Sequence, residues 1–277
     1  MGDTDRPTVR VRGAAGGWPY PWPNVAELAR QLPSDRWTLI GGLMTQMHAI
    51  HRGVDAVRPT NDVDIVLHIE TTRGAPQAAA DALELLGYRI KEGIDPRNEV
   101  AHRFTRGDTH IDIVTSADGG QREEARGADG EEDIVDVVDV VVADHPAPSV
   151  EEKMRRKDMV KIEGGTQALR RTANYQLEIE RGEVTTVSVP RPFGALILKA
   201  AAFVTDSRDP NRHLFDAAVL LACVEDPIEE REGLGGSDRK RLLILERNLG
   251  PSDAAWLRMP VADARRGQNA LRVLLAV

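Results

Sequence analysis

The sequence has little cysteine, no long apolar runs and no surplus of positive charge. A single cysteine, Cys223, among 277 residues excludes an internal disulfide framework and a structural zinc site made of several cysteines. No apolar run approaches the roughly 18 residues of a membrane-spanning helix, and the N-terminal segment lacks the apolar core of a signal peptide. We therefore expect a cytoplasmic protein without a membrane partner.

The charge balance limits the classes of partner. Lysine and arginine number 36 against 44 aspartates and glutamates, which gives a formal net charge of −8. A protein built mainly to coat nucleic acid needs a surplus of basic residues to neutralise phosphates, so this class is disfavoured, although local contact with nucleic acid remains compatible. The length and the 41% of hydrophobic residues suit two domains of ordinary size.

Composition changes along the chain predict its organisation. Residues 1–24 are rich in Gly, Pro and Arg and are predicted to form an extended arm. The prolines near residue 148 suggest a boundary between a domain over 25–148 and a mainly helical C-terminal domain over 149–277. Residues 117–133 are almost wholly polar and predict a surface loop, and the apolar stretch 134–142 predicts a strand.

Hydrophobic periodicity predicts alternating strands and helices in the first domain, then a charged helix, a hairpin and further helices. Gly107-Asp108 predicts a hairpin turn, so the sheet should be mixed, and Gly182 predicts the turn of the later hairpin. The fold class we expect is α+β: a mixed sheet with flanking helices, followed by a mainly helical domain with one β-hairpin. The expected strands are 37–42, 63–69, 102–107 and 110–116, the expected helices include 43–53, 74–87 and 151–161, and the hairpin spans 172–190.

Two aspartates at the start of one expected strand carry the chemistry. Alternate residues of a strand face the same side, so Asp62 and Asp64 would present two carboxylates to one point in space. Two like charges held together need a cation, and Mg²⁺ is usually bound by one or two carboxylates together with phosphate oxygens. A third carboxylate, Asp112 on the strand over 110–116, would bind a second ion or act as a general base.

The Gly41-Gly42 pair lies where a strand turns into a helix. Without side chains there, backbone N–H groups at the helix N-terminus would approach an anionic phosphate closely. The order Gly-Gly, helix, Asp-x-Asp and later single aspartate resembles the nucleotidyltransferase superfamily over residues 37–116. Many members have Gly-Ser at the glycine pair, and the 20 positions from Gly42 to Asp62 form a longer gap than in compact members.

The second half resembles the AbiEii-like nucleotidyltransferases, which include type IV toxins. The resemblance rests on a lysine within a helix, a charged stretch and an aspartate on the next helix, here Lys199, Arg208, Arg212 and Asp216. It implies that Lys199 contacts the phosphates of a nucleoside triphosphate such as ATP, and that Asp216 belongs to the nucleotide site. Arg58 and Thr60, in the long gap, would contact phosphate or cap the turn.

The resemblance implies Mg²⁺, or Mn²⁺ in its place, at Asp62, Asp64 and Asp112. It also implies an acceptor hydroxyl on tRNA or on a protein, and an antitoxin partner that controls the activity. Two alternatives remain open: a transferase that modifies a small antibiotic-type molecule, and a catalytically silent nucleotide- or protein-binding module. For single residues, Lys199 could extend from a half-buried helix face to solvent, and Asp112 could be an ordinary charge at a sheet edge.

Overall fold

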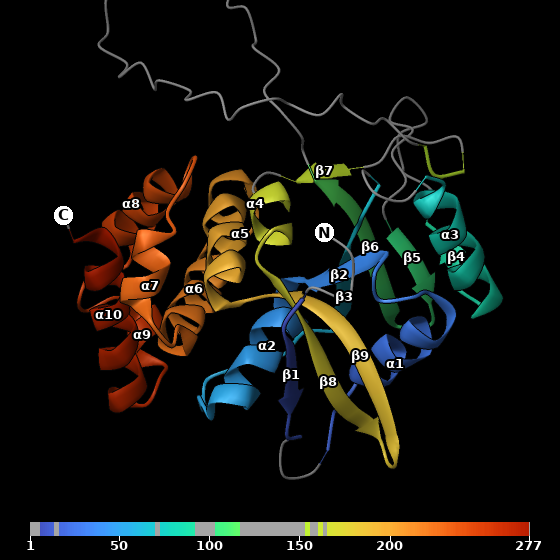
Figure 1. Ribbon diagram of the computed structural model, residues 1–277, viewed down its shortest axis with the longest axis horizontal. Helices are drawn as coiled ribbons and strands as arrows, with labels where there is room; N and C mark the ends of the chain where they lie inside the picture. Colours follow the sequence, from blue (N-terminus) through green and yellow to red (C-terminus); the bar gives the residue numbers. More distant parts are fainter. Residues whose placement is uncertain are drawn as a thin grey trace, which may run out of the picture.

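The chain adopts an α+β fold, seen in a computed structural model. Sheets and their flanking helices occupy one side of the molecule, and the C-terminal helices gather on the other (Figure 1). No helix in the described part of the chain is long and apolar enough to cross a membrane. The structure describes residues 6–13, 17–69, 73–91, 103–116, 153–155, 160–162 and 165–276.

The larger sheet is mixed, as predicted from the Gly107-Asp108 turn. Its strand order is β2-β3-β6-β5-β4, and β7 pairs with β6 beside this path. The β3–β6 and β6–β7 pairs are parallel, whereas the other pairs are antiparallel. The strands are β2 (Trp37–Ile40), β3 (Asp62–Leu67), β4 (Arg89–Ile90), β5 (Arg103–Arg106), β6 (Thr109–Ser116) and β7 (Val160–Ile162).

The helices of this half agree with the predicted pattern. They are α1 (Trp22–Gln31), α2 (Gly41–Arg52) and α3 (Ala75–Leu85). Helix α2 follows β2 without a loop and ends at Arg52, one residue before the end of the helix expected over 43–53; Gly53 caps it with a left-handed φ of 64°. The α2 N-terminus is therefore fixed directly to the end of a buried strand.

A smaller sheet joins the N-terminal residues to the predicted hairpin. Strands β8 (Thr172–Glu180) and β9 (Glu183–Pro190) form that hairpin, and Gly182 turns it with a φ of 80°. Strand β1 (Thr8–Val11) pairs in parallel with β8, so the described part of the predicted arm belongs to a sheet, and α1 begins within its last residues. The predicted boundary at residue 148 lies outside the described residues, and the two-domain division stays a prediction.

One helix prediction was wrong. The segment 151–161 was expected to be helical because of its charges, but Val160–Ile162 forms β7 and pairs in parallel with β6. The apolar residues on either side of Lys161 suit a strand, and the end of β6 offers backbone groups to pair with. The loop predicted over 117–133 and the strand predicted over 134–142 lie outside the described residues.

The C-terminal part is mainly helical, as predicted. Helix α5 is apolar through most of its length, and its first nine helical positions after Pro192 are buried. Helix α6 is buried from His213 to Cys223 and packs against both α5 and α10. The helices are α4 (Gly165–Leu169), α5 (Pro192–Thr205), α6 (Asn211–Cys223), α7 (Pro227–Glu232), α8 (Asp238–Asn248), α9 (Ala254–Leu257) and α10 (Val261–Leu275).

His48 ties α2 to the end of the hairpin. Its Nε2 donates to the carbonyl oxygen of Pro190 at 2.8 Å, and its ring meets the Tyr175 ring edge-on with centroids 5.5 Å apart. The ring is 1% exposed, and burial lowers its pKa to about 4. His48 is therefore neutral in the fold, and it lies at the point where β9 leads toward α5.

Acidification should weaken the fold through His48. Its folded pKa is about 4 against 6.5 for the free side chain, so the unfolded chain binds more protons between these values. The stabilisation is complete above pH 6.5 and is lost as pH falls toward 4. We expect His48→Gln to reduce the loss of unfolding free energy between pH 7 and 4.5 by about 2–3 kcal/mol, measured by urea denaturation. His51→Gln is the comparison: burial also lowers the pKa of His51, but this side chain is more exposed, so we expect a smaller change than for His48→Gln. Parallel profiles for His48→Gln and wild type would contradict this assignment.

Candidate active site

The predicted aspartates lie side by side on two parallel strands. Asp62 and Asp64 alternate on β3, and the register of the β3–β6 pair sets Asp64 opposite Asp112. Adjacent strands lie about 4.8 Å apart, so the two paired carboxylates share one face of the sheet. Burial raises the pKa of Asp64 to about 6, and the neighbouring charge of Asp112 adds to the effect. Lys199 opposes this shift, which brings a cation from α5 into the electrostatic environment of the cluster.

Both predicted glycines are required by close contacts. Gly41 has a φ of 72°, and a Cβ there would overlap the Asp64 carboxylate. A Cβ on Gly42 would lie 2.9 Å from the Cβ of Thr60, which is closer than real side chains pack. The departure from Gly-Ser therefore has a local cause, because Thr60 fills the space that a serine side chain would enter. Thr60 also accepts a hydrogen bond from the backbone N–H of Asp62 at 3.4 Å.

The N-terminus of α2 is available to an anion. Ile40 at the N-cap position supplies no side-chain hydrogen bond, and the first turn holds no acidic residue. The N–H groups of a first helical turn have no partners within the helix, and the helix dipole favours negative charge there. The α2 N-terminus, next to Asp64, is thus a site where a phosphate would be stabilised.

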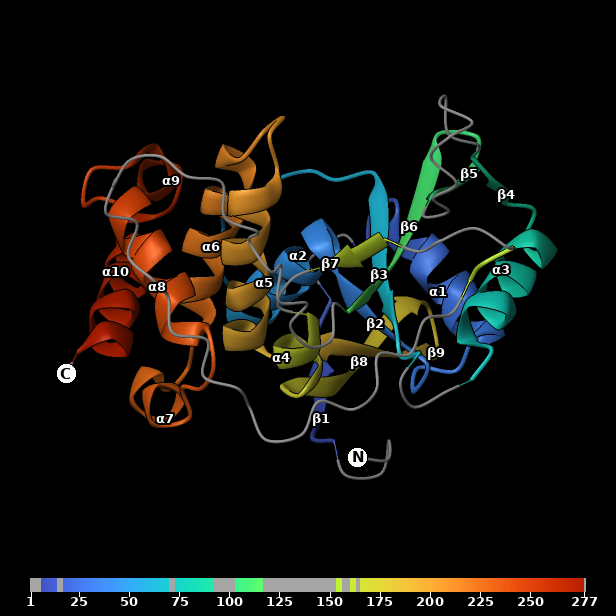
Figure 2. The same cartoon turned by 90° about the horizontal axis from the view of Figure 1, so that it is seen from above.

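Lys199 and Asp216 form a buried ion pair, and Lys199 interacts electrostatically with Asp64. Lys199 Nζ lies 2.7 Å from Asp216 Oδ2, and the two side chains are 5% and 2% exposed. Arg58 adds a second cation, with Nη2 3.5 Å from the same oxygen. The ammonium group of Lys199 does not extend to solvent, so the alternative interpretation of a half-exposed lysine was wrong. Arg58 belongs to the segment between α2 and β3, which Figure 2 shows running from beside the C-terminal helices to the start of β3.

No function was assigned from the sequence to two basic residues that lie near the aspartates. Arg103 on β5 donates from Nε to Asp112 Oδ1 at 2.7 Å and from Nη2 to Oδ2 at 2.5 Å. Arg212, noted only as part of the resemblance, lowers the pKa of Asp64 and pairs with Asp206 at 2.7 Å. Asp112 is therefore an ion-paired residue of an inner strand rather than an ordinary charge at a sheet edge.

The fit to a divalent cation is good for two of the three aspartates. The half-buried Asp64 carboxylate, with like charges beside it and a raised pKa, is a group that a divalent cation would stabilise in its ionised form. Asp62 shares its strand face, so the pair matches the one or two carboxylates that Mg²⁺ uses. Within the described ranges no group of three or more His, Cys, Asp or Glu side chains is arranged to hold a metal ion. Asp112 already has a cationic partner on both oxygens.

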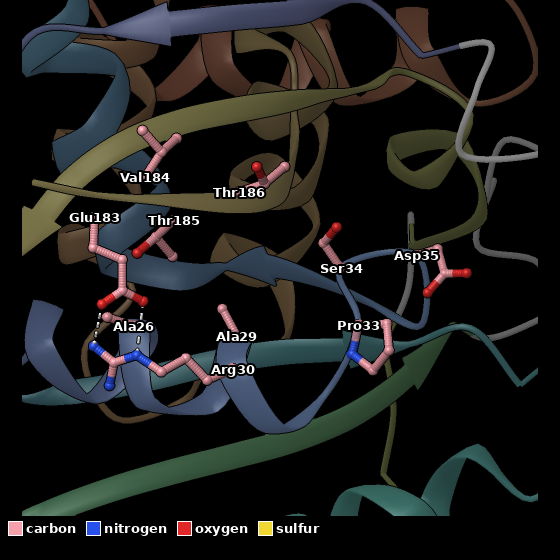
Figure 3. A pocket seen from close by; sticks show the side chains of 10 residues that line it. All are labelled: Ala26, Ala29, Arg30, Pro33, Ser34, Asp35, Glu183, Val184, Thr185 and Thr186. Atoms are coloured by element: carbon pink, nitrogen blue, oxygen red, sulfur yellow. Dashed lines mark hydrogen bonds and ion pairs between the residues drawn. The ribbon is translucent and has the colours of Figure 1, made fainter.

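A hollow of about 390 Å³ elsewhere on the molecule contains none of the predicted site residues. It lies between α1 and the start of β9, and Figure 3 shows Arg30 pointing across it to Glu183. Arg30 Nε donates to Glu183 Oε1 at 2.8 Å, and Arg30 also pairs with Glu180. Because both charges are satisfied locally, this hollow adds nothing to the chemistry of the aspartates.

Comparisons with known proteins leave the family open. No protein-family model and no curated protein sequence matches the chain. A solution structure of the antibiotic-resistance factor ANT(2'')-Ia is similar over 81% of this chain and 91% of that chain, with 16% identity and a TM-score of 0.38. Similarity at this level assigns no function, so the functional argument rests on the residues of the site.

Gly41→Ala should destabilise the fold more than a substitution at a glycine that has a similar positive φ but free space around its Cβ position. Gly53 has a similar φ of 64° but nothing within 4 Å of an added Cβ, so Gly53→Ala is the matched control. We expect about 1 kcal/mol of destabilisation from the positive φ in both variants, and about 1–3 kcal/mol more in Gly41→Ala from overlap with Asp64. Urea denaturation measures the difference. Equal losses in the two variants would show that Asp64 does not occupy this space.

Asp64→Asn should stabilise the metal-free protein above pH 6. The pKa of Asp64 is raised from 3.8 to about 6, so the folded chain holds this proton more tightly and loses stability as pH rises through that window. At pH 7.5 in EDTA we expect Asp64→Asn to raise the unfolding free energy by about 1–3 kcal/mol, and the gain should nearly vanish at pH 4. A gain of equal size at both pH values, or a loss at pH 7.5, would contradict the electrostatic account.

Proposed function

We propose that the chain is a metal-dependent nucleotidyltransferase, which moves a nucleoside monophosphate from a triphosphate to an acceptor hydroxyl. The observation that carries the proposal is the position of Asp64 beside an uncapped helix N-terminus, with Asp62 on the same strand face and Lys199 in electrostatic interaction with Asp64. Paired carboxylates, an anion-binding helix end and a lysine are the groups that a metal–triphosphate complex needs. The resemblance over residues 37–116 supports the same assignment.

Asp62 and Asp64 would hold Mg²⁺, with Mn²⁺ as the alternative ion. When bound, the ion would neutralise charge on the triphosphate and polarise the phosphoryl group. Gly41 and Gly42 keep the α2 N-terminus open to the phosphate oxygens, since a side chain on either would collide with Asp64 or Thr60. The site thus combines carboxylates for a cation with backbone donors for an anion.

Lys199 would supply a compact positive charge to the phosphates. Asp216 holds its ammonium at 2.7 Å, and Arg58 reaches the same carboxylate, so Asp216 positions two cations at once. A buried ion pair seldom adds stability to a fold, because desolvation of both charges offsets their attraction. Because Lys199 also interacts electrostatically with Asp64, we favour a role in binding over a role in folding, and the pair would extend the nucleotide site to α5 and α6.

The proposed reaction needs no covalent intermediate on the protein. The acceptor hydroxyl attacks the α-phosphorus, the bond from this phosphorus to the bridging oxygen breaks, and pyrophosphate leaves with the bonding electrons. The hydroxyl proton passes to solvent. The residues of the site act by binding and orienting the triphosphate, which is the main source of catalysis in phosphoryl transfer.

The charges around the site favour an anionic acceptor. A cationic antibiotic-type acceptor would need unpaired carboxylates near the α-phosphate, and among the residues that the structure describes three candidates for that task already have basic partners. These pairs are Asp112 with Arg103, Asp216 with Lys199 and Asp206 with Arg212. We therefore place tRNA first among acceptors and a protein hydroxyl second. Toxin-like activity held in check by an antitoxin rests on the AbiEii-like resemblance alone.

Pyrophosphate release from each of the four nucleoside triphosphates, with Mg²⁺ and total tRNA, tests the proposal. Asp62→Ala combined with Asp64→Ala should lower release by at least about 10³-fold, because the cation loses both its carboxylates. Asp55→Asn, an exposed change in the segment before β3, should leave it unchanged. The nucleotide that supports release identifies the donor.

The acceptor is identified in the same reactions by α-³²P label. Label on tRNA is the expected result, and label on protein would select the other macromolecular acceptor. Nucleotide binding by the wild type without pyrophosphate release, in reactions supplied with a cognate lysate, would overturn the enzymatic proposal and support a silent nucleotide-binding module.

A further inference from the structure

Arg103 is the basic residue in most direct contact with the aspartate cluster. It lies on β5 directly opposite Asp112, and its Nε and Nη2 donate to the two separate oxygens of that carboxylate at 2.7 and 2.5 Å. This fork geometry is the strong form of a carboxylate–guanidinium pair, and lysine cannot reproduce it. The side chains are 33% and 15% exposed, so solvent weakens the pair only in part.

Arg103 also faces the other two aspartates. Its pKa is raised first by the hydrogen bonds to Asp112 and further by the charges of Asp62 and Asp64. A guanidinium is charged at every physiological pH, so the cluster has a permanent cation before any ion binds. Two of its five N–H donors bind Asp112, which leaves others for oxygen atoms of a substrate.

We propose that the Arg103 guanidinium takes the place of a second divalent cation, so that the site holds one ion, bound by Asp62 and Asp64. This inference rests on the proposed function. Asp112 then acts as a positioning residue for Arg103, which differs from the sequence prediction that made it a metal ligand or a general base. One divalent ion and one guanidinium balance the three carboxylates, whereas a second ion would add positive charge and would have to displace Arg103.

The neighbouring cations support a single ion. Lys199 on α5 and Arg212 on α6 both interact electrostatically with Asp64, so positive charge already reaches the cluster from these two helices. Arg103 supplies it from the opposite side, on β5. A triphosphate bound at the α2 N-terminus would therefore meet basic side chains from three elements together with one ion. Arg103 would supply positive charge to the part of the site where a two-metal enzyme binds its second ion.

Mn²⁺ binding followed by electron paramagnetic resonance tests this inference without relying on turnover. The wild-type chain is titrated with Mn²⁺ alone, and the number of ions bound per chain is counted. We expect one ion for the wild type, one for Asp112→Asn, none for Asp62→Asn combined with Asp64→Asn, and two for Arg103→Ala, where Asp112 becomes free to bind. Arg89→Ala on the adjacent strand β4 is the matched control and should bind one ion.

The outcomes separate this inference from the proposed function. Two ions on the wild type, falling to one in Asp112→Asn, would overturn the role of Arg103 and leave the nucleotidyltransferase proposal intact. No ion on the wild type would overturn both. Arg103→Gln, which keeps hydrogen-bond donors and removes the charge, guards against misfolding of Arg103→Ala, and it should also bind a second ion. A single ion on both folded Arg103 variants would overturn the inference.

Discussion

Repulsion among three carboxylates on neighbouring parallel strands is the constraint around which the rest of the site is arranged. The register that pairs Asp64 with Asp112 holds two like charges a strand spacing apart, and Asp62 adds a third from the same face. Burial makes the repulsion costly, as the raised pKa of Asp64 reports. Arg103 on β5 and Lys199 on α5 supply positive charge that partly compensates this repulsion. The remaining negative charge at Asp62 and Asp64 favours binding of a cation.

The same constraint links the two halves of the described chain. Lys199 and Asp216 come from the C-terminal helices, yet Asp216 also pairs with Arg58 from the segment that precedes β3. His48 makes a second connection, from α2 to the end of β9. Both links converge on the elements that bear the glycines and the aspartates. The helical part therefore completes the site by supplying charge, and its packing fixes where that charge lies.

The residues that sequence could predict are those governed by local rules. Strand alternation predicted that Asp62 and Asp64 share a face. The close approach of a phosphate to the glycine pair stays a prediction, and the contacts with Asp64 and Thr60 give a second, local reason for the two glycines. Arg103 was missed although the signal was present: a two-residue turn at Gly107-Asp108 sets Arg103 opposite Asp112 by counting back from the turn. No local rule of this kind predicts which distant segments pair with each other in a sheet. The β1–β8 and β6–β7 pairs depend on which strand edges lie free in the fold, and a charged segment such as 151–161 does not reveal that.

A crystal structure with Mn²⁺ and a non-hydrolysable nucleoside triphosphate analogue tests the central claim most directly, because anomalous scattering locates each ion. The account predicts a single anomalous peak in contact with Asp62 and Asp64, phosphate oxygens at the N-terminus of α2 and near Lys199, and Arg103 still paired with Asp112. An ion bound away from Asp62 and Asp64, or a triphosphate bound elsewhere on the chain, would contradict it.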